Sequence, residues 1–277
     1  MINDSDRYNR QIALFGQDGQ NRLRETRVGI VGLGGLGSHM AQQLAYLGIT
    51  SFVLVDGDRT SSHGLNRQVT AYPSDVNEYK TNLAERAIRA IQPDADVTNI
   101  SHHLPHAEAA AALRDVTMIF GGLDHDAPRL RLTDLASTHQ IAYVDAATDT
   151  HSARGSLAYG GRVVTAGVNP GCLFCLDLLD QQQIRHAAMT LEQLTADATI
   201  YGVPIDDLTG IGPSVVTING VVASLATTEA MVHITGLRTP TKHLVYRGDH
   251  GGVRLNLDPP STTCPYCARW CATSPPW

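Results

Sequence analysis

Residues 32–37 of this chain form a glycine loop, Gly-Leu-Gly-Gly-Leu-Gly, which constrains the fold more than any other feature. The loop follows a short apolar run at 27–32 and precedes a helical pattern at 38–47. Glycines at G-x-G-x-x-G spacing allow a tight turn and let backbone N–H groups and a helix N-terminus approach a phosphate. Asp56 ends the next apolar run, where a carboxylate can accept hydrogen bonds from a ribose. The pattern predicts nucleotide binding, although NAD and the adenosine part of ATP would be held in much the same way.

Strand and helix patterns alternate throughout the first half of the chain. Short apolar runs alternate with segments whose apolar residues recur at helical spacing. This alternation predicts an α/β fold with a Rossmann-like, mostly parallel sheet flanked by helices on both faces. The expected strands are 27–32, 51–56, 95–101, 116–121 and 141–146, and the expected helices are 38–47, 78–91, 107–113 and 127–138.

The second half has a different pattern. A hairpin is predicted at 152–168, turning at Gly160-Gly161. Residues 172–212 are polar and irregular, which predicts a long excursion or a short helix plus loop that faces the substrate. A buried helix is expected over 213–235, with Pro213 at its first position and Gly236 just past its end. Closing antiparallel strands are expected at 244–247 and 253–257, before a cysteine-bearing tail.

Composition bounds the partners and the compartment. The 277 residues carry a net charge of −6 with no basic stripe, which excludes nucleic acid as an expected partner. The polar N-terminus lacks the apolar segment of a signal peptide. The apolar run at 213–235 contains Asn219, Glu229 and His233, so we expect no membrane span. The expected location is the cytoplasm, where paired cysteines more often hold metal than form disulfides.

Charged residues downstream of Asp56 favour ATP over NAD. Arg67, Lys80 and Asp124 each lie where the carboxyl edge of the sheet would face a ligand bound on the glycine loop. A triphosphate needs cations beside it and a carboxylate to hold Mg²⁺. Taken singly, each residue has a simpler interpretation, since Arg and Lys are usually solvated and Asp124 could cap the helix that follows. Their joint spacing predicts an ATP site.

Two C-x-x-C pairs predict a structural zinc site. Four thiolates suit a closed tetrahedral Zn²⁺ site, here formed by Cys172, Cys175, Cys264 and Cys267. Redox-active pairs are the competing interpretation, but neither pair begins a helix in a thioredoxin-like context. Cys271 is left over and could act as an acceptor, but it lies four residues past a predicted zinc ligand, so a tail thiol or a spare ligand is expected.

At these residues the chain resembles the ThiF and MoeB family of adenylyltransferases, which shares its fold with the adenylation domains of ubiquitin-activating enzymes. The matching motifs are Arg7-Tyr8-Asn9-Arg10-Gln11, the loop Gly32 to Gly37, the block Leu65-Asn66-Arg67-Gln68, and Lys80 and Asp124 at the family spacing. The resemblance covers nearly the whole chain. It implies one adenylation domain over 1–277, with a nucleotide-binding half at 1–150 and a substrate-binding, zinc-bearing half at 151–277.

The resemblance also implies a reaction. A C-terminal carboxylate of a ubiquitin-like protein, a sulfur-carrier protein or a peptide attacks the α-phosphate of ATP, which gives an acyl-adenylate and pyrophosphate. Arg10 resembles the arginine that such homodimers insert into the neighbouring subunit's site, and Asp124 would hold Mg²⁺. The catalytic set would be Arg10, Arg67, Lys80 and Asp124, and the nucleotide would contact Gly32, Gly34, Gly35, Gly37, Asp56, Asp58, Asn66, Arg67, Gln68, Lys80, Leu123 and Asp124.

The chain departs from the family pattern at three places. The family's Asn before the Leu of N-L-x-R-Q is here Gly64, so its role is lost or falls to Asn66 or His63. The residue after the metal aspartate, often Asn in the family, is here His125. Its imidazole could contact nucleotide or substrate, but a local surface residue is the expected role. No cysteine occurs between Leu176 and Pro213, so a separate molecule is expected to supply the sulfur or amine acceptor.

Two further functions stay open on the sequence alone. An NAD-dependent oxidoreductase would account for the glycine loop but leaves the ATP set unexplained. A non-catalytic partner subunit would account for Gly64 and the missing acceptor cysteine. The histidines His102, His103 and His106 could hold a metal, but the neighbouring Pro105 makes a solvated turn the expected structure.

Overall fold

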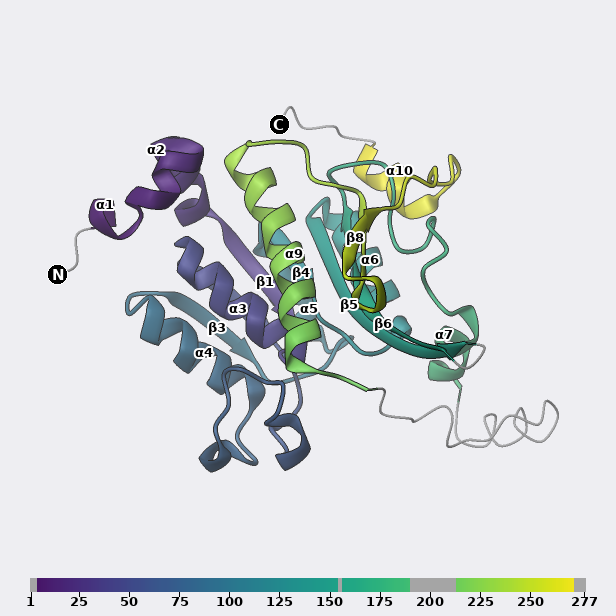
Figure 1. Ribbon diagram of the computed structural model, residues 1–277, viewed down its shortest axis with the longest axis horizontal. Helices are drawn as coiled ribbons and strands as arrows, with labels where there is room; N and C mark the ends of the chain where they lie inside the picture. Colours follow the sequence, from purple (N-terminus) through teal and green to yellow (C-terminus); the bar gives the residue numbers. More distant parts are fainter. Residues whose placement is uncertain (1–3, 154–155, 190–212, 272–277) are drawn as a thin grey trace.

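A single mixed sheet organises the molecule in the computed structural model, which describes residues 4–153, 156–189 and 213–271 (Figure 1). Among these residues the sheet has eight strands in the order β3-β2-β1-β4-β5-β6-β7-β8. Strands β1 to β5 pair in parallel, and β6 to β8 continue the sheet antiparallel. The predicted α/β fold is confirmed. The bounds are β1 Arg27–Val31, β2 Ser51–Val55, β3 Asp96–Ile100, β4 Met118–Gly121, β5 Ala142–Ala153, β6 Ser156–Ala166, β7 His243–Arg247 and β8 Gly252–Leu255.

Helices cover both faces of the sheet, and the two faces have separate cores. Alternate residues of β2 divide between them, with Phe52 and Leu54 in one core and Val53 and Val55 in the other. On one face lie α2 (Asn9–Glu25), α3 (Gly35–Leu47), α4 (Lys80–Ile91) and α9 (Val216–Thr235), with α1 (Asp4–Arg7) leading into α2. On the other lie α5 (Ala107–Ala112), α6 (Asp126–His139), α7 (Gln181–Ala187) and α10 (Pro265–Cys271). Short 3₁₀ turns occupy Ser62–Gly64, Pro73–Asp75, Leu113–Asp115 and Gly248–His250.

The strand order reverses between β1 and β4, and this reversal positions the site. The chain runs outward from β1 through β2 to β3, then returns to add β4 on the other side of β1. Connections therefore leave the carboxyl ends of β1 and β4 in opposite directions. A crevice forms at such a point in open α/β sheets, and ligands bind there.

The hairpin exists, but the predicted position of its turn, at Gly160-Gly161, was wrong. Strands β5 and β6 pair along their whole lengths, and the connecting residues 154–155 lie outside the described part of the chain. Gly160 and Gly161 lie inside β6, between β5 and β7. A Cβ at Gly161 would come within 2.4 Å of the Ala147 carbonyl oxygen and 2.6 Å of a Val222 methyl on α9. These glycines permit close packing inside the sheet rather than a turn.

Three other expectations need correction or restriction. Pro213 precedes α9 by three residues, because the helix begins at Val216, whereas Gly236 ends it in the left-handed conformation as expected. The N-terminal helix α2 and the tail helix α10 were not predicted. Of the excursion expected at 172–212, residues 190–212 lie outside the described chain and the remainder contains α7. In the part of the chain that can be judged, no helix combines the length and hydropathy that a bilayer crossing requires.

Candidate active site

Two adjoining cavities open at the carboxyl edge of the parallel strands. The larger has a volume of about 510 Å³ and borders Arg67, Gln68 and Asn219. The smaller has a volume of about 360 Å³ and borders Asp56 and His103. Both are lined by the same seven residues where they meet, namely Gly34, Asp58, Lys80, Gly122, Leu123, Asp124 and His125. One extended ligand could therefore occupy both.

The glycine loop forms the wall that the cavities share. Gly32 has a φ of +85°, and a Cβ at Gly37 would lie 1.8 Å from the Gly32 carbonyl oxygen, so neither position tolerates a side chain. Helix α3 begins at Gly35, and its cap residue Gly34 offers no side chain to the first turn. The first N–H groups of α3 are thus left for a ligand, and their partial positive charge favours an anion.

Asp56 stands at the end of β2 with its carboxylate held by the backbone. Its oxygens accept hydrogen bonds from the Leu33 N–H at 2.7 Å and the Asp58 N–H at 2.8 Å. Burial raises the pKa of Asp56 above its ordinary value, against the lowering effect of Lys80 and the two amides. The side chain thereby holds the glycine loop in place through the Leu33 N–H. It also borders the smaller cavity, where it can accept hydrogen bonds from hydroxyl groups of a ligand.

Lys80 begins α4 and points into the region that both cavities share. Its Nζ lies 2.6 Å from the Asp58 carboxylate and 3.8 Å from that of Asp56. His103 Nε2 also lies 3.2 Å from Asp58. Burial alone would raise the pKa of Asp58, but the hydrogen bonds and charges of Lys80 and His103 outweigh it and lower this pKa. An anionic ligand that took Lys80 would have to replace Asp58 as its partner.

Arg67 and Gln68 border the larger cavity from the connection after β2. Arg67 Nη1 donates to the His63 carbonyl at 2.7 Å, which fixes the arginine locally. Gln68 is only 3% exposed; its Oε1 accepts from Thr60 at 3.2 Å. Its Nε2 has no hydrogen-bond partner among the described residues. A buried amide with an unused donor suggests a missing acceptor.

Asp124 lies in the loop between β4 and α6, exposed and bordering both cavities. Helix α6 begins at Asp126 after the cap residue His125, so Asp124 does not cap it. The carboxylate therefore remains available to a cation bound at the shared region. His125 is exposed as expected and borders the same region.

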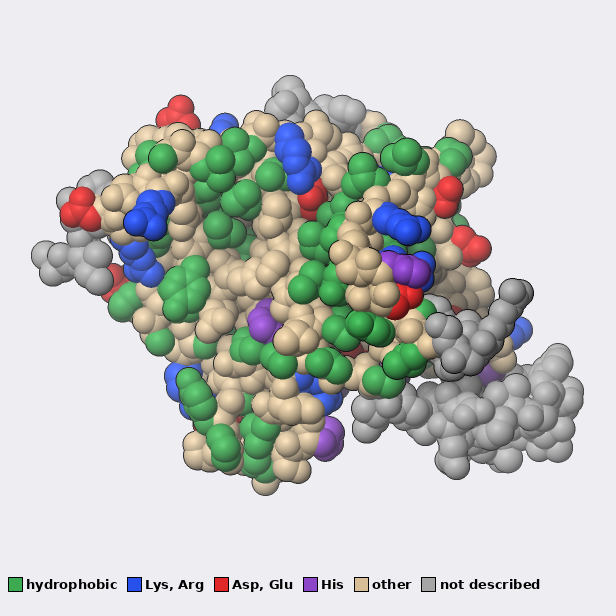
Figure 2. Space-filling model, viewed as in Figure 1, with side chains coloured by type: hydrophobic (Ala, Val, Ile, Leu, Met, Phe, Trp, Pro, Cys, Tyr) green, Lys and Arg blue, Asp and Glu red, His purple; other side chains and the backbone are tan. Residues whose placement is uncertain are grey.

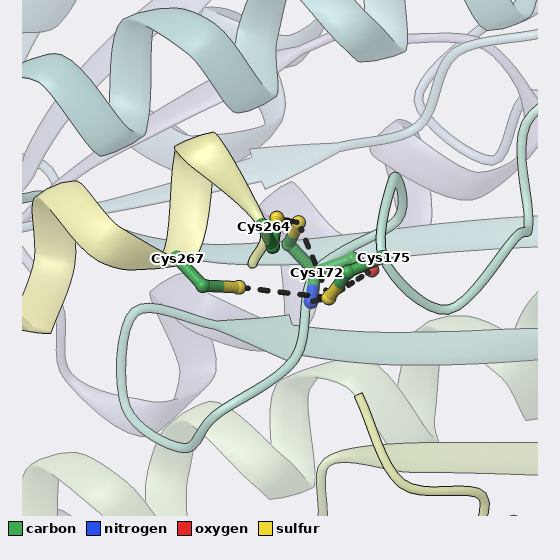
Figure 3. Close-up of side chains that lie close together, drawn as sticks. All are labelled: Cys172, Cys175, Cys264 and Cys267. Carbon is green, nitrogen blue, oxygen red and sulfur yellow. Dashed lines mark hydrogen bonds between the residues drawn. The ribbon is translucent and has the colours of Figure 1, made fainter. Parts of the chain in front are cut away.

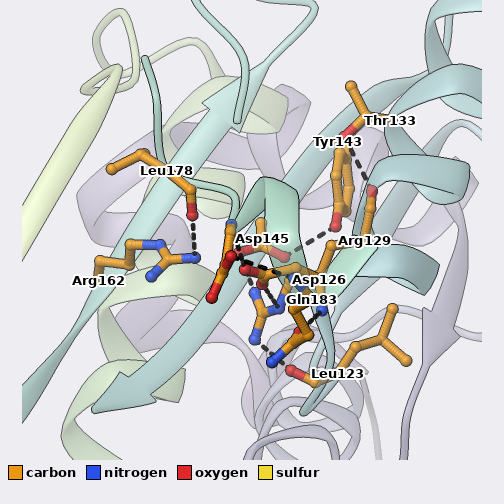
Figure 4. Close-up of polar contacts among 10 residues, drawn as sticks. Leu123, Asp126, Arg129, Thr133, Tyr143, Asp145, Arg162, Leu178 and Gln183 are labelled. Atoms are coloured by element: carbon orange, nitrogen blue, oxygen red, sulfur yellow. Dashed lines mark hydrogen bonds and ion pairs between the residues drawn. The ribbon is translucent and has the colours of Figure 1, made fainter. Parts of the chain in front are cut away.

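A buried ion pair supports this loop from behind (Figure 4). The Arg129 guanidinium bonds the Asp145 carboxylate at the end of the parallel part of β5 and the carbonyl oxygen of Leu123. Tyr143 donates to the same carboxylate at 2.8 Å. Burial lowers the pKa of Arg129, but the charges of Asp145, Tyr143, Asp126 and Asp124 together outweigh this effect and raise the pKa, so the guanidinium stays charged. Arg129 is thus a positioning residue for the Leu123–Asp124 backbone.

The four cysteines gather beyond the other end of the sheet (Figure 3). Cys172 and Cys175 follow β6, whereas Cys264 and Cys267 lie at the start of α10, so the expectation that neither pair begins a helix was wrong for the second pair. The Sγ–Sγ distances are 3.8 Å within the first pair and 3.6 Å for both Cys172–Cys264 and Cys175–Cys267. A tetrahedral site with Zn–S bonds of about 2.3 Å requires sulfur separations of about 3.8 Å. The donor set therefore fits zinc.

Three expected site residues do not border the cavities: Gly37, which is buried against Gly32 within the glycine loop, and Arg10 and Asn66. Arg10 is exposed on α2 and borders neither, and Asn66 is exposed and borders neither. His63, the other candidate to replace the family asparagine, borders the larger cavity. The three histidines at 102–106 are exposed, and His102 stacks on His106. Two groups of side chains there could take a metal: His102 with His106 and Glu108, and His103 with Asp56 and Asp58.

Sequence reasoning missed several residues that border the larger cavity. They are Arg59, Ser61, Arg129, Thr148, Ser214 and Asn219. Arg129 carried no signal because its partner lies on a separate strand. Asn219 did carry one, since it is a polar residue within an apolar helical run.

Comparisons with known proteins place the chain. The ThiF family model matches residues 8–265. The chain is 26% identical over 273 residues to the sulfur carrier protein ThiS adenylyltransferase of Escherichia coli, covering 96% of this chain and 97% of that protein. It is 38% identical over 128 residues to the molybdopterin-synthase adenylyltransferase of Escherichia coli, covering 46% of this chain and only about half, 51%, of that protein.

A solved structure agrees in fold. Escherichia coli MccB, crystallised with MccA-N7isoASN, superposes with a TM-score of 0.73 at 18% identity. The superposition covers 96% of this chain and 75% of MccB. With its fold, its glycine loop and a family match over most of its length, this chain belongs to the ThiF family.

Proposed function

We propose that the chain catalyses ATP-dependent adenylation of a C-terminal carboxylate, with release of pyrophosphate. The observation that carries this proposal is the convergence of Arg67, Lys80 and Asp124 on one cavity beside the glycine loop. A nicotinamide cofactor would need neither the cations nor the exposed carboxylate. The two sequence relatives described above are both named as adenylyltransferases, which supports the same reaction.

The geometry suggests how ATP would lie. The smaller cavity would take the nucleoside, with Asp56 accepting from the ribose, and the larger cavity would take the phosphates and the attacking carboxylate. Arg67, Gln68 and Lys80 would bind phosphate oxygens, together with the first N–H groups of α3. Asp124 would hold Mg²⁺, which supplies neutralisation of phosphate charge.

The reaction then follows from positioning. A carboxylate oxygen forms a bond to the α-phosphorus, and the bond from that phosphorus to the bridging oxygen breaks. The electron pair leaves on pyrophosphate, so charge builds up where Arg67 and Lys80 lie. Fixed donors that face developing charge are the main contribution a protein can make to phosphoryl chemistry. Lys80 would exchange Asp58 for a phosphate when ATP enters.

The carboxylate is proposed to belong to a ubiquitin-like protein, a sulfur-carrier protein or a peptide. Several hydrophobic side chains are exposed over α9 and the antiparallel strands, among them Val221, Leu157, Tyr159, Val253 and Leu255 (Figure 2). Exposed apolar side chains that gather on one face can mark a protein-binding site. The described thiol outside the cluster, Cys271, ends α10, so we propose that another protein supplies the sulfur or amine acceptor.

The remaining features complete the proposal. The four clustered cysteines would hold one structural Zn²⁺ with no open position for water. Residues 1–277 would act as one adenylation domain in the cytoplasm, with nucleotide-binding and substrate-binding halves at 1–150 and 151–277. Arg10, distant from both cavities of its own chain, would reach the site of the neighbouring subunit in a homodimer.

Nucleotide binding and pyrophosphate exchange test the proposal. We expect the wild-type protein to bind ATP in calorimetry and to exchange labelled pyrophosphate into ATP when Mg²⁺ and a small protein ending in Gly-Gly are present. Asp124→Ala and Arg67→Ala should each slow the exchange on the order of 10²-fold. Arg131→Ala, which removes an exposed charge from α6 outside both cavities, is the matched control.

Two outcomes would contradict the proposal in different ways. Binding of NADH without binding of ATP would move the chain to the oxidoreductases. Binding of ATP and of the partner, without any exchange, would make it a non-catalytic subunit. Unchanged exchange in Asp124→Ala would remove the role assigned to that carboxylate.

A further inference from the structure

A buried amide on α9 lies directly against the glycine loop. Asn219 is 1% exposed, borders the larger cavity and approaches the loop at Gly35. A Cβ added to Gly35 would lie 2.2 Å from Asn219 Nδ2, closer than any non-bonded contact allows. Besides Asn219, the nearest residue to this Cβ would be Arg67, whose Cδ would lie 3.6 Å from it, at an ordinary van der Waals distance. Asn219 is therefore what excludes a side chain from position 35.

The amide has donor capacity that contacts within the described chain do not use. A side-chain amide nitrogen carries two N–H donors. Nδ2 of Asn219 donates one hydrogen bond, to Ser214 Oγ at 3.0 Å, and Ser214 lies 3.4 Å from Oδ1 of the same side chain. The amide thus stands beside the uncapped start of α3 with an N–H to spare.

A second amide on the same cavity gives an independent indication of a ligand. Gln68 Nε2 is buried and has no hydrogen-bond partner in the described part of the chain. Two amide donors, the α3 N–H groups and the Arg67 guanidinium therefore surround one space. A space lined by so many donors suits a multiply charged oxyanion.

We propose that Asn219 donates a hydrogen bond to a phosphate group of the bound triphosphate, on the side of the glycine loop away from the ribose. The inference rests on the proposed function and extends it, because it assigns the phosphate contact to a helix of the second half of the chain. Asn219 borders only the larger cavity, whereas Asp56 borders only the smaller. The nucleoside therefore lies at the other end of the ligand, and Asn219 contacts the phosphates beyond the first. Gly35 is glycine so that this amide can reach its place.

Affinities for ATP and AMP test the assignment, because only ATP extends into the larger cavity. In calorimetry with Mg²⁺, Asn219→Ala should weaken ATP binding roughly tenfold to a hundredfold, as expected for a hydrogen bond to a charged group. AMP affinity should stay within twofold. Asn219→Asp keeps the shape but places a carboxylate beside the phosphates, so it should lose more ATP affinity than the alanine variant.

The matched control is Thr227→Ala. It also removes a buried, hydrogen-bonded polar group from α9, but one that contacts Gln43 rather than the cavity. It should leave both affinities within twofold. Thermal midpoints of every variant show whether the fold is kept, and Asn219→Ser, which retains a donor, gives an intermediate case if the alanine variant unfolds.

Substitution at position 35 gives a second test, which combines the thermal midpoint with the ATP affinity. An asparagine with a purely structural role would affect the midpoint alone. Gly35→Ala should lower both the thermal midpoint and the ATP affinity, because the new methyl group overlaps Asn219. Adding Asn219→Ala should restore the midpoint to that of Asn219→Ala alone, while ATP affinity remains at the level of that single variant. A double variant no more stable than Gly35→Ala would overturn the proposed contact.

The outcomes separate this inference from the proposed function. If the wild-type protein binds no ATP, the function itself fails. If the wild type binds ATP and Asn219→Ala binds it equally well, only the inference fails. Equal loss of AMP and ATP affinity would also overturn it, since Asn219 would then shape the loop without contacting the outer phosphates. A loss in Asn66→Ala with none in Asn219→Ala would return the role to the exposed asparagine.

Discussion

The two cavities and the cysteine cluster lie at opposite edges of one sheet and are built in opposite ways. The cavities lie at the carboxyl ends of β1, β2 and β4, and their charged groups pair where solvent can reach them, as Lys80 does with the half-exposed Asp58. The cluster follows the end of β6, which pairs with the start of β5, and Cys172 and Cys264 are buried in the core. An open site whose ion pairs can be exchanged suits a substrate that comes and goes. A closed site with every donor turned inward suits a fixed cross-link.

The largest effect should come from breaking the cluster. Cys264→Ser removes one of four zinc ligands, and since metal binding contributes directly to folding we expect the thermal midpoint to fall by roughly 10 °C or more. Metal analysis should give about one zinc per wild-type chain and none in the variant. The control is Cys271→Ser, an exposed thiol outside the cluster, which should change neither value. Zinc-free wild-type protein with an unchanged midpoint would break the comparison.

A second effect should come from Arg129, which borders the larger cavity but forms a buried ion pair. Arg129→Met leaves the Asp145 carboxylate buried without its ion-pair partner, so the free energy of unfolding should fall by about 3–5 kcal/mol. The Leu123 carbonyl also loses its donor, so pyrophosphate exchange should slow even where the protein remains folded. Urea denaturation and exchange assays measure the two effects, with the exposed Arg131→Met as control. Loss of stability without loss of rate would show that Arg129 only supports the fold.

The smallest effect concerns the loop that leads to Lys80. Asp75 accepts hydrogen bonds from Arg86, which lower the pKa of this carboxyl to about 2. Because this pKa is lower in the folded chain than in the unfolded chain, where it is near 3.9, the ionised carboxyl stabilises the fold at pH values above about 3.9. This stabilisation is lost as the pH falls through about 2. Because Arg86 is half exposed, Asp75→Asn should cost only about 1 kcal/mol at pH 7.

Urea midpoints at two pH values check this sign. The difference in urea midpoint between the wild type and Asp75→Asn should be smaller at pH 3 than at pH 7, because at pH 3 the carboxyl is partly protonated in the unfolded chain. A difference that grows on acidification would show that the ion pair does not stabilise the folded state. ATP affinity should not change, because Asp75 borders neither cavity.

The features that could be predicted are those marked by residues close together in the sequence. The glycine loop, Asp56 and the strand ends are marked by neighbouring residues, and the sheet then brings Arg67, Lys80 and Asp124 together without further information. The cysteine pairs are equally local, and only their meeting depended on the fold. These parts of the prediction needed residue type and spacing alone.

Three of the missed features depend on partners outside their own helix or strand. The outer part of β5, residues 147–153, has no strand pattern of its own and extends because β6 pairs with it. Arg129 looks like a surface helix residue until Asp145 is placed beside it. Gly161 suggested a turn because glycine is common there, whereas the packing of Val222 on α9 is its actual cause.

The cysteine cluster also changes the topology of the chain. Each of its two cross-pair contacts joins residues that are 92 apart, so a bound metal would close a ring that contains α9, β7 and β8. For a covalent link, closing a ring of this size removes about 4–5 kcal/mol of conformational freedom from the unfolded chain. Asn219 lies on the ring, while the loop it contacts lies outside it. With metal bound, the ring would limit how far α9 can move from the glycine loop, so we expect removal of the metal to loosen the contact between Asn219 and that loop.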